Sequence, residues 1–337
     1  MDTVKQEAKH NEAGGDVITR IRALLREQLG EVESRLMQLP DLQPDSLREA
    51  VAMIVGSGGK RIRPMMVLLA AGMLGRADRN KAIDLASAVE MLQTATLVHD
   101  DLIDGSLVRR GAATLNAVWT PAATVLTGDY LFAYASNLAS RVDNVRVMSI
   151  FSETLGAIVG GELRQMFGDW RLRATRDDYF RRIYAKTASL YVLATTTAGV
   201  ISNSSVAEVN ALLDYGRDFG IAFQIVDDVL DFTGEQATVG KPVGSDLRRG
   251  MITLPTIAYA ERHADDPLLA CALRGECTPR HYDQLVANIR ASDAIDAALT
   301  EARSITENAK RALAVFPAGE HRALLMQLAD YNVGRER

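Results

Sequence analysis

The sequence has little cysteine, little proline, no excess of basic charge and no long apolar segment, and these shortages exclude several classes of protein. The two cysteines among the 337 residues lack the four-ligand clustering of a zinc site. A formal net charge of −5 gives no indication of nucleic-acid binding, which usually requires an excess of basic residues. No apolar run reaches the roughly 18 residues of a membrane span, and the polar N-terminus lacks the apolar core of a signal peptide. We therefore expect a cytoplasmic protein.

The two cysteines, Cys271 and Cys277, leave two alternatives open. They could form a disulfide, or they could remain two thiols in a reducing compartment. We favour the two thiols because disulfides are rare in such compartments.

Strand signals are scarce as well, whereas apolar residues recur at helical 3–4 spacing through most of the chain. We expect a loose tail at 1–16 and one all-α domain at 17–337, a single large helical bundle around a central cavity. The predicted helices are 17–39, 46–55, 65–74, 82–103, 121–140, 145–170, 177–200, 206–232, 253–260, 267–273, 279–289, 293–316 and 319–333.

Two acidic motifs dominate the polar residues of these helices. Asp100-Asp101-Leu-Ile-Asp104 and Asp227-Asp228-Val-Leu-Asp231 each place aspartates at i, i+1 and i+4. On an α-helix these positions share one side of a single turn, where like charges repel. Apolar residues flank both motifs, so each should face the interior. Such carboxylates need a cation, and Mg²⁺ is the natural candidate.

Two further Asp-Asp pairs provide an internal comparison. Asp177-Asp178 and Asp265-Asp266 lie in polar surroundings and have no third aspartate at i+4. We interpret them as helix-start or loop pairs. A single acidic motif is usually a solvated helix face, but two on apolar helices favour a paired metal site.

Basic residues near the acidic motifs predict an anion site. The glycine loop at 56–59 is followed directly by cations, and backbone N–H groups and cationic heads can converge there on phosphate. A basic surface turn is the alternative. The segment 233–250 is long for a connection and is a candidate lid. The cations that we expect around the acids are Lys60, Arg61, Arg63, Arg109, Arg110, Lys186 and Lys241.

Charge balance supports this grouping. Six aspartates carry about −6, three Mg²⁺ ions about +6, and a diphosphate about −3, so the basic residues must offset the surplus. No Ser–His–Asp set and no activated thiol are visible. His99 adjoins Asp100, but we interpret it as a packed or capping histidine rather than a base.

With these motifs in place, the sequence resembles the trans-isoprenyl diphosphate synthases of the all-helical polyprenyl synthetase family, in particular long-chain types such as octaprenyl and heptaprenyl diphosphate synthases. The resemblance covers about residues 17–337 and implies a prenyltransferase. The matching segments, in the family's order, are GGKRIRP (58–64), HDDLIDGSLVRRG (99–111), TGDYL (127–131), YAKTASL (184–190), FQIVDDVLDF (223–232) and GKPVGSDLRRGMITLP (240–255).

The resemblance implies that isopentenyl diphosphate adds repeatedly to an allylic diphosphate, with three Mg²⁺ ions in the site. The implied metal residues are Asp100, Asp101, Asp104, Asp227 and Asp228, with Asp231 more peripheral. The implied allylic-diphosphate residues are Arg109, Lys186, Gln224 and Lys241. The implied isopentenyl-diphosphate residues are Lys60, Arg63 and Arg110, with Arg61 and Gln93 beside them. Lys186 and Thr187 would also steady the allylic cation, and the C-terminal arginines could close over the isopentenyl site.

Two positions depart from the family pattern. Gln93 stands where members often have histidine, and Met251 stands where the lid often has lysine. Arg248 or Arg249 could supply the lid cation instead.

Product length is expected to depend on the helix that carries the first motif. Short-chain members often place aromatic residues four and five positions before the first aspartate, where this chain has Thr96 and Ala95. We therefore predict an all-trans product of C30–C50, with a tunnel floor formed by Met91, Leu92 or Phe132.

Several alternatives remain. The chain could be a geranylgeranyl or shorter-chain synthase, a terpene cyclase, a diphosphate-binding module without turnover, or a non-catalytic subunit of a heteromeric synthase. The family resemblance further implies a homodimer, and an apolar product could bring the protein to a membrane surface.

Overall fold

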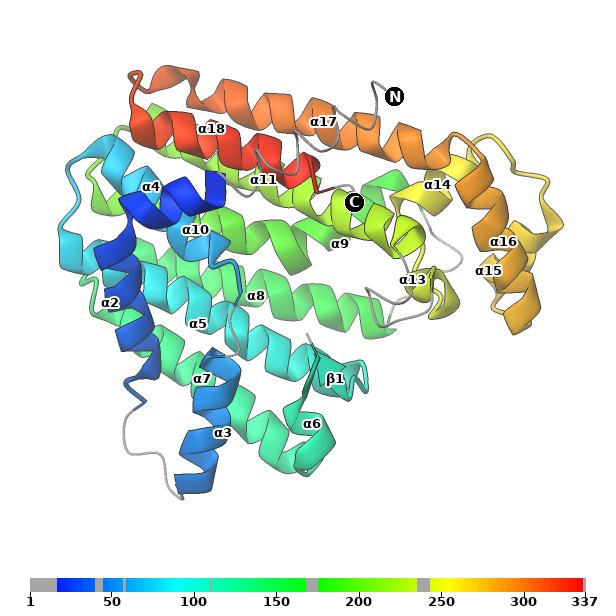
Figure 1. Ribbon diagram of the computed structural model, residues 1–337, viewed down its shortest axis with the longest axis horizontal. Coiled ribbons are helices and arrows are strands. Elements are labelled where there is room, and N and C mark those ends of the chain that lie inside the picture. The colour runs from blue at the N-terminus through cyan, green and yellow to red at the C-terminus, as the bar shows by residue number, and fades with distance from the viewer. Residues whose placement is uncertain are drawn as a thin grey trace.

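Helices make up nearly all of the regular structure in the computed structural model, which describes residues 17–39, 45–56, 59–109, 111–167, 175–234 and 243–335. The predicted tail at 1–16 lies outside the described residues, as do Arg110 and Lys241. The all-α prediction is confirmed (Figure 1).

Residues 17–24 are helical and lead through a turn at Leu25 into the first labelled helix. The helices of the bundle are α2 (Arg26–Met37), α3 (Asp45–Gly56), α4 (Ile62–Leu74), α5 (Arg79–Ile103), α6 (Leu115–Val118), α7 (Pro121–Ser140), α8 (Val145–Phe167), α9 (Arg176–Ile183), η1 (Tyr184–Ala188), α10 (Ser189–Ile201) and α11 (Val206–Thr233). The C-terminal helices are α13 (Ser245–Arg248), α14 (Leu254–Ala260), α15 (Pro267–Arg274), α16 (Pro279–Ala291), α17 (Ala294–Ala312), η2 (Leu313–Val315) and α18 (Glu320–Val333).

The predicted helices all appear, and four details differ. The predicted helix at 17–39 is interrupted by the turn at Leu25. The predicted helix at 177–200 is divided by η1, a π-helical turn. A short antiparallel hairpin, β1 (Val108–Arg109) with β2 (Ala112–Ala113), follows α5. The small helices α6 and α13 were not predicted, because four residues carry too little periodicity to be recognised.

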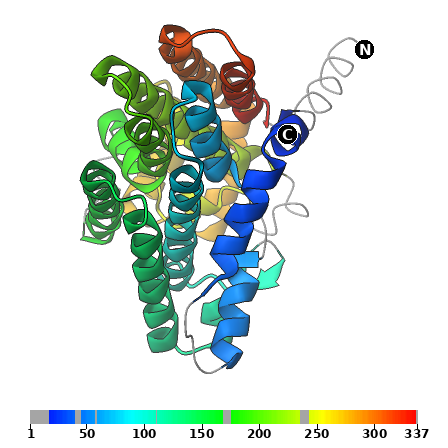
Figure 2. The same ribbon diagram turned by 90° about the vertical axis from the view of Figure 1, so that its left-hand side faces the viewer.

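Helix α10 forms the centre of the bundle and carries no charged residue. Every residue of α10 is buried, as expected of a helix without a charged, solvent-facing side. It packs against α4, α5, α8 and α11. In Figure 2, turned by 90°, most of the bundle helices are seen close to end-on.

Two glycines allow α11 to approach α10 closely. A Cβ at Gly216 would lie 2.7 Å from the Tyr191 carbonyl oxygen, and a Cβ at Gly220 would lie 2.5 Å from Ala188 Cα. Neither position has room for a larger residue. The close contact fixes the register between the helix that carries the second acidic motif and the helix that follows Lys186.

Helices α5 and α11 run in the same general direction, so their C-terminal ends come to the same side of the bundle (Figure 1). These ends carry the two acidic motifs. Capping helps to define where the helices begin: Asp78 caps the start of α5, and Ser205 with Glu208 forms a capping box at the start of α11.

Gly128, in the TGDYL segment, leaves the space in which the His99 ring packs. A Cβ at Gly128 in α7 would overlap the His99 ring. The ring also lies 5.1 Å from the Phe132 ring, and Nε2 lies 3.1 Å from the Val125 carbonyl oxygen. The prediction of a packed histidine is confirmed.

The cysteine prediction was wrong. Cys271 and Cys277 form a disulfide, with their Cα atoms 5.3 Å apart. The turn between α15 and α16 brings them together, which the sequence spacing alone did not reveal. Among the residues described, no helix combines the length and apolar character needed to span a membrane.

Candidate active site

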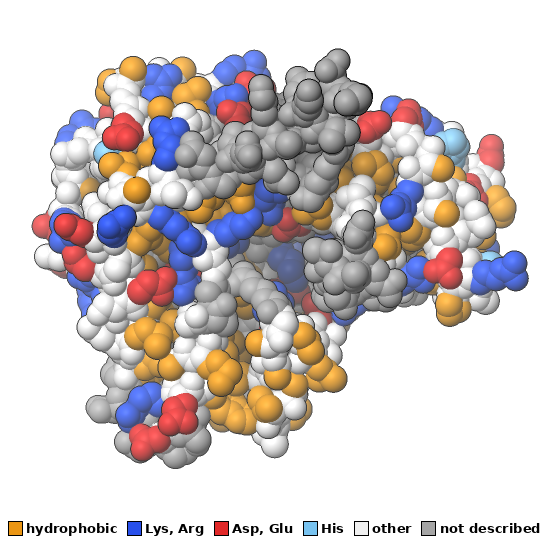
Figure 3. Space-filling model, viewed as in Figure 1, with side chains coloured by type: hydrophobic (Ala, Val, Ile, Leu, Met, Phe, Trp, Pro, Cys, Tyr) orange, Lys and Arg blue, Asp and Glu red, His pale blue; other side chains and the backbone are white. Residues whose placement is uncertain are grey.

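Both acidic motifs line one cavity of about 830 Å³. Its wall also includes cationic residues from the N-terminal turn of α4, from the β1 strand, from η1 and from the C-terminus. Figure 3 shows basic side chains gathered along the rim of a hollow in the centre of this face. The cations in the lining are Lys60, Arg61, Arg63, Arg109, Arg182, Lys186, Arg249 and Arg335.

The aspartates of the first motif lie in and just after the last turn of α5, and each has a basic partner. Arg109 Nε donates to both carboxylate oxygens of Asp101 at 2.9 Å. Asp100 Oδ2 lies 3.7 Å from Lys186 Nζ, and Asp104 Oδ2 lies 3.7 Å from Arg249 Nη1. A helix C-terminus carries partial negative charge, so three carboxylates there make a strong site for cations.

The second motif occupies the last two turns of α11 and is surrounded differently. Asp227 Oδ1 lies 3.1 Å from Arg335 Nη1, which comes from the C-terminal end of the chain. Asp228 accepts hydrogen bonds from Tyr179 Oη at 2.7 Å and from Gln224 Nε2 at 2.8 Å. Gln224 lines the cavity beside this carboxylate, and its predicted contact with the allylic diphosphate stays a prediction.

Burial raises the pKa of three of these carboxylates, Asp100, Asp227 and Asp228, and so makes them harder to ionise. Desolvation raises the pKa of Asp228 from 3.8 to about 7, although Gln224 and Tyr179 donate to it. Desolvation also raises the pKa of Asp100 to about 6, with Lys186 opposing the shift and Glu162 adding to it. Carboxylates in this condition gain much from a metal ion, because the ion neutralises charge that burial penalises.

Asp231 makes contacts that differ from those of a free metal ligand. Its Oδ1 accepts from the Ser245 backbone N–H at 3.2 Å and from Ser245 Oγ at 2.7 Å. Its Oδ2 accepts from the Asp246 backbone N–H at 3.1 Å. Both oxygens thus hold the first turn of α13. We therefore assign Asp231 a structural role in place of the predicted metal contact.

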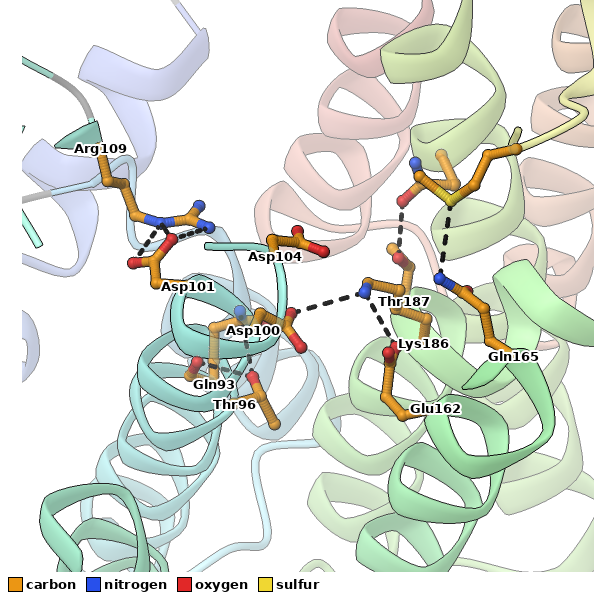
Figure 4. Close-up of polar contacts among 12 residues, drawn as sticks. Gln93, Thr96, Asp100, Asp101, Asp104, Arg109, Glu162, Gln165, Lys186 and Thr187 are labelled. Carbon is orange, nitrogen blue, oxygen red and sulfur yellow. Dashed lines mark hydrogen bonds and ion pairs between the residues drawn. The ribbon is translucent and has the colours of Figure 1, made fainter. Parts of the chain in front are cut away.

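The π-helical turn places Lys186 and Thr187 in the cavity wall. A π-turn widens the helix by one residue and is frequent at functional sites. Lys186 Nζ lies 2.8 Å from Glu162 Oε1 of α8 and faces Asp100 (Figure 4). Thr187 Oγ1 donates to Gln224 Oε1 at 2.6 Å. Although desolvation alone would lower it, the pKa of Lys186 is raised because Asp100 and Glu162 face its ammonium group.

The basic residues at the start of α4 differ in their contacts: some stabilise the turn and others face the cavity. The Arg61 guanidinium donates to Glu33 at 2.7 Å, to Glu90 at 2.9 Å and to the Val55 carbonyl oxygen at 2.7 Å. These acceptors hold the guanidinium in the turn, while Arg61 also lines the cavity, and its predicted substrate contact stays a prediction. We infer that Lys60 and Arg63 are the cations that this turn presents to a ligand.

Arg63 lies against an aromatic platform. Its guanidinium carbon is 4.4 Å from the centroid of the Tyr191 ring. Arg63 Nε and Tyr191 Oη have no hydrogen-bond partner among the described residues. Lys60 donates to Tyr331 Oη and lies over that ring, 5.0 Å from its centroid.

The residues predicted to set product length take different positions. Thr96 lines the cavity, as does Gln93, whose Nε2 lies 3.5 Å from Thr96 Oγ1. Ala95, Leu92 and Met91 are fully buried in the core, away from the cavity wall. Phe132 packs against His99 instead. Of these five described residues only Thr96 lines the cavity, and the product tunnel itself stays a prediction.

Sequence reasoning missed the partners that come from distant helices. Glu162, Tyr179 and Arg182 each contact or line the site, and no local motif marks them. Arg335, one of the C-terminal arginines expected at the isopentenyl site, lines the same cavity. The comparison pairs behave as predicted: Asp177 and Asp178 lie in the first turn of α9, and Asp266 caps α15. The predicted roles of Arg110 and Lys241 remain predictions because these residues lie outside the described ranges.

Comparison with known proteins agrees with the site. The family model described as Polyprenyl synthetase matches residues 44–289. The fold and the family match together place the chain among the all-α prenyltransferases. The chain belongs to the polyprenyl synthetase family, and it is a trans-polyprenyl diphosphate synthase by that membership.

Individual relatives cover most of the chain. An octaprenyl diphosphate synthase from Haemophilus influenzae is 36% identical over 84% of this chain and 86% of its own length. The crystal structure of a decaprenyl diphosphate synthase from Rhodobacter capsulatus has a TM-score of 0.88 and 35% identity, covering 95% of this chain and 99% of that one. A polyprenyl synthase from Caulobacter crescentus CB15, complexed with calcium and isoprenyl diphosphate, has a TM-score of 0.88 and 34% identity, covering 95% and 98%.

Proposed function

We propose that the enzyme condenses isopentenyl diphosphate with an allylic diphosphate, farnesyl or geranylgeranyl diphosphate, by repeated head-to-tail 1′-4 additions. The observation that carries this proposal is the single cavity that holds two aspartate motifs and two separate sets of cations. Two diphosphate substrates require two sets of cations, whereas a terpene cyclase needs to bind only one diphosphate.

Magnesium is the metal that this donor set favours, and we infer three ions per site. Asp100, Asp101, Asp104, Asp227 and Asp228 offer hard oxygen ligands. The raised pKa values of Asp100 and Asp228 fit carboxylates whose charged form is stabilised by a nearby cation. Bound Mg²⁺ would supply Lewis-acid stabilisation of the departing diphosphate.

The chain's own residues would then share the remaining tasks. Arg109 and Lys186 lie beside the first motif, where they would bind the allylic diphosphate and offset its charge as it leaves. Thr187, held by Gln224, would place its hydroxyl oxygen near the developing allylic cation. Lys60 and Arg63 would hold isopentenyl diphosphate so that its double bond meets the cation. The released diphosphate would accept the proton.

A product of C30–C50 is supported by Thr96, a small residue in the cavity wall, and by the long-chain names of the relatives. Each additional buried CH₂ stabilises the growing chain by about 0.8 kcal/mol. A geranylgeranyl or shorter product is the alternative. A non-catalytic subunit would be expected to lose aspartates from one motif, and all six are present.

We further propose a cytoplasmic homodimer that meets membranes through its product. On α8 the apolar side chains of Val159, Leu163 and Met166 are 43%, 48% and 59% exposed and follow one helical face. A second copy of the chain would cover this stripe. Light scattering after size exclusion would give one protomer mass if this is wrong.

The decisive test of function is incubation of the purified protein with Mg²⁺, farnesyl diphosphate and labelled isopentenyl diphosphate. We expect incorporation and a product mass corresponding to at least six isoprene units, C30. Absence of incorporation would refute the proposed activity, and a C20 product would refute the long-chain assignment alone.

A further inference from the structure

The second acidic motif holds the start of α13 in place through Asp231. Three donors at the start of α13 bond to the Asp231 carboxylate, and Gly244 N–H donates to the Asp231 carbonyl oxygen at 2.8 Å. The last aspartate of the motif therefore caps a helix that begins fourteen residues later. Because both its oxygens are occupied, its position and that of α13 are coupled.

The two arginines that end α13 point to different partners. Arg248 Nη2 donates to Asp283 at 2.6 Å, and Arg248 Nε donates to the Val243 carbonyl oxygen at 3.2 Å, so its side chain is fixed against α16. Arg249 lines the cavity, and its Nη1 lies 3.7 Å from Asp104 of the first motif. Consecutive residues thus provide one structural and one cavity-facing guanidinium.

The contact between Arg249 and Asp104 is long, and both side chains are about two-fifths exposed. Exposed pairs of this kind are weak and exchange readily. A diphosphate gives a guanidinium two parallel acceptors, which bind it more strongly than one distant carboxylate. Arg249 is therefore placed to leave Asp104 once cations neutralise that carboxylate.

We propose that Arg249 is a phosphate-binding residue of the allylic diphosphate subsite, and that Asp231 is its positioning residue. Asp231 fixes the start of α13, and α13 carries Arg249 over the cavity toward the first motif. The inference rests on the proposed function and decides which of the two lid arginines, Arg248 or Arg249, binds the diphosphate. It also gives the third aspartate of the second motif a role other than metal binding.

The neighbouring arginine provides a matched control for the first test. Arg249→Met and Arg248→Met remove the same charge from adjacent positions. With Mg²⁺ and isopentenyl diphosphate saturating, we expect Arg249→Met to raise the KM for farnesyl diphosphate at least tenfold. The inhibition constant of inorganic diphosphate should rise in parallel. Arg248→Met should change both by less than twofold. Equal effects of the two variants would overturn the proposal.

Met251 offers a charge-relocation test in the same cavity. Met251 lies two residues after Arg249 in the chain and also lines the cavity. Its Sδ atom is 3.6 Å from Nε2 of Gln165. Adding Met251→Lys to Arg249→Met should recover most of the lost affinity for farnesyl diphosphate. No recovery would show that charge at this wall does not bind the diphosphate.

A double-mutant cycle separates positioning from metal binding. If Asp231 acts through Arg249, Asp231→Ala should raise the KM for farnesyl diphosphate, and combining it with Arg249→Met should add little. The Mg²⁺ concentration for half-maximal rate should stay within twofold. Multiplied effects and a raised Mg²⁺ requirement would make Asp231 a metal ligand instead. Asp231→Asn, which keeps one acceptor oxygen, should give an intermediate KM if Asp231→Ala does not fold.

The experiments distinguish failure of the Arg249 proposal from failure of the proposed function. Wild-type protein without any incorporation of isopentenyl diphosphate would refute the function. Normal wild-type turnover with equal Arg249→Met and Arg248→Met variants would refute this inference alone.

Discussion

Asp228→Asn should stabilise the protein in the absence of metal while abolishing most of its activity. Asp228 is 3% exposed, and burial raises its pKa to about 7. At neutral or higher pH the folded protein must therefore keep a poorly solvated charge, whereas the unfolded chain solvates that charge freely. Asparagine has nearly the same shape and removes the charge.

The pKa displacement sets the magnitude. A shift from 3.8 to about 7 corresponds to a penalty of about 4 kcal/mol, at 1.36 kcal/mol per pKa unit. Asparagine also weakens the hydrogen bonds from Tyr179 and Gln224, each worth about 1 kcal/mol. The net gain in the free energy of unfolding is then about 2 kcal/mol, or about 3 °C in Tm for a chain of this size.

The sign of the pH dependence follows from the direction of the shift. The folded state binds a proton at Asp228 more tightly than the unfolded state does, so wild-type stability increases as pH falls through about 7. The variant has no such proton to bind. Its advantage should be full at pH 8 and should shrink steadily toward pH 5.

Thermal unfolding in EDTA at pH 8, 7, 6 and 5 measures this difference directly. Asp177→Asn, at an exposed position in the first turn of α9, is the matched control and should leave Tm nearly unchanged at every pH. Adding Mg²⁺ and diphosphate should reverse the order, because the wild type would bind them more tightly. An Asp228→Asn protein that melts at or below the wild-type temperature at pH 8 would refute the argument from burial.

Three other substitutions test separate features. Thr96→Phe puts a ring into the cavity wall and should shorten the product by at least one isoprene unit in mass analysis; an unchanged length would exclude Thr96 from the product path. Gly220→Ala should lower the free energy of unfolding in guanidinium by about 1–3 kcal/mol because its Cβ would meet Ala188, whereas Gly156→Ala, with open space around it, should be neutral or stabilising. Tyr191→Leu removes the ring beneath Arg63 and should raise the KM for isopentenyl diphosphate several-fold, whereas Tyr191→Phe should not, and equal KM values in the two variants would contradict the platform role.

Much of the fold was predictable because long helices carry a strong periodic signal. The bounds of α7 agree with the predicted 121–140, and those of α11 with the predicted 206–232 to within one residue. The division at Tyr184–Ala188 was not predictable, because the following helix is buried on all sides and its sequence has no one-sided apolar pattern that would reveal a shift of one residue. The disulfide between Cys271 and Cys277 depends on a turn that spacing does not specify.

The site was predictable where chemistry is local and unpredictable where it depends on contacts between distant helices. The two aspartate motifs and Lys186 share the cavity as expected. Arg61 and Asp231 matched the expected residue types, yet their side chains bond to Glu33 and to the start of α13. The sequence shows that a charged side chain is present at each position. It does not show which donor or acceptor in the folded protein will bond to that side chain.

The π-helical turn also has a consequence for how this enzyme tolerates insertions and deletions. An extra residue in a helical turn rotates everything beyond it by about 100° relative to an uninterrupted helix. Here α9, which supplies Tyr179 to Asp228, and α10, which fills the core, are phased independently on either side of Lys186. Deleting Ala185 would restore a regular helix and turn one of the two faces away from its partners. A single residue in this turn thus sets the alignment between the active-site face of one helix and the core face of the next.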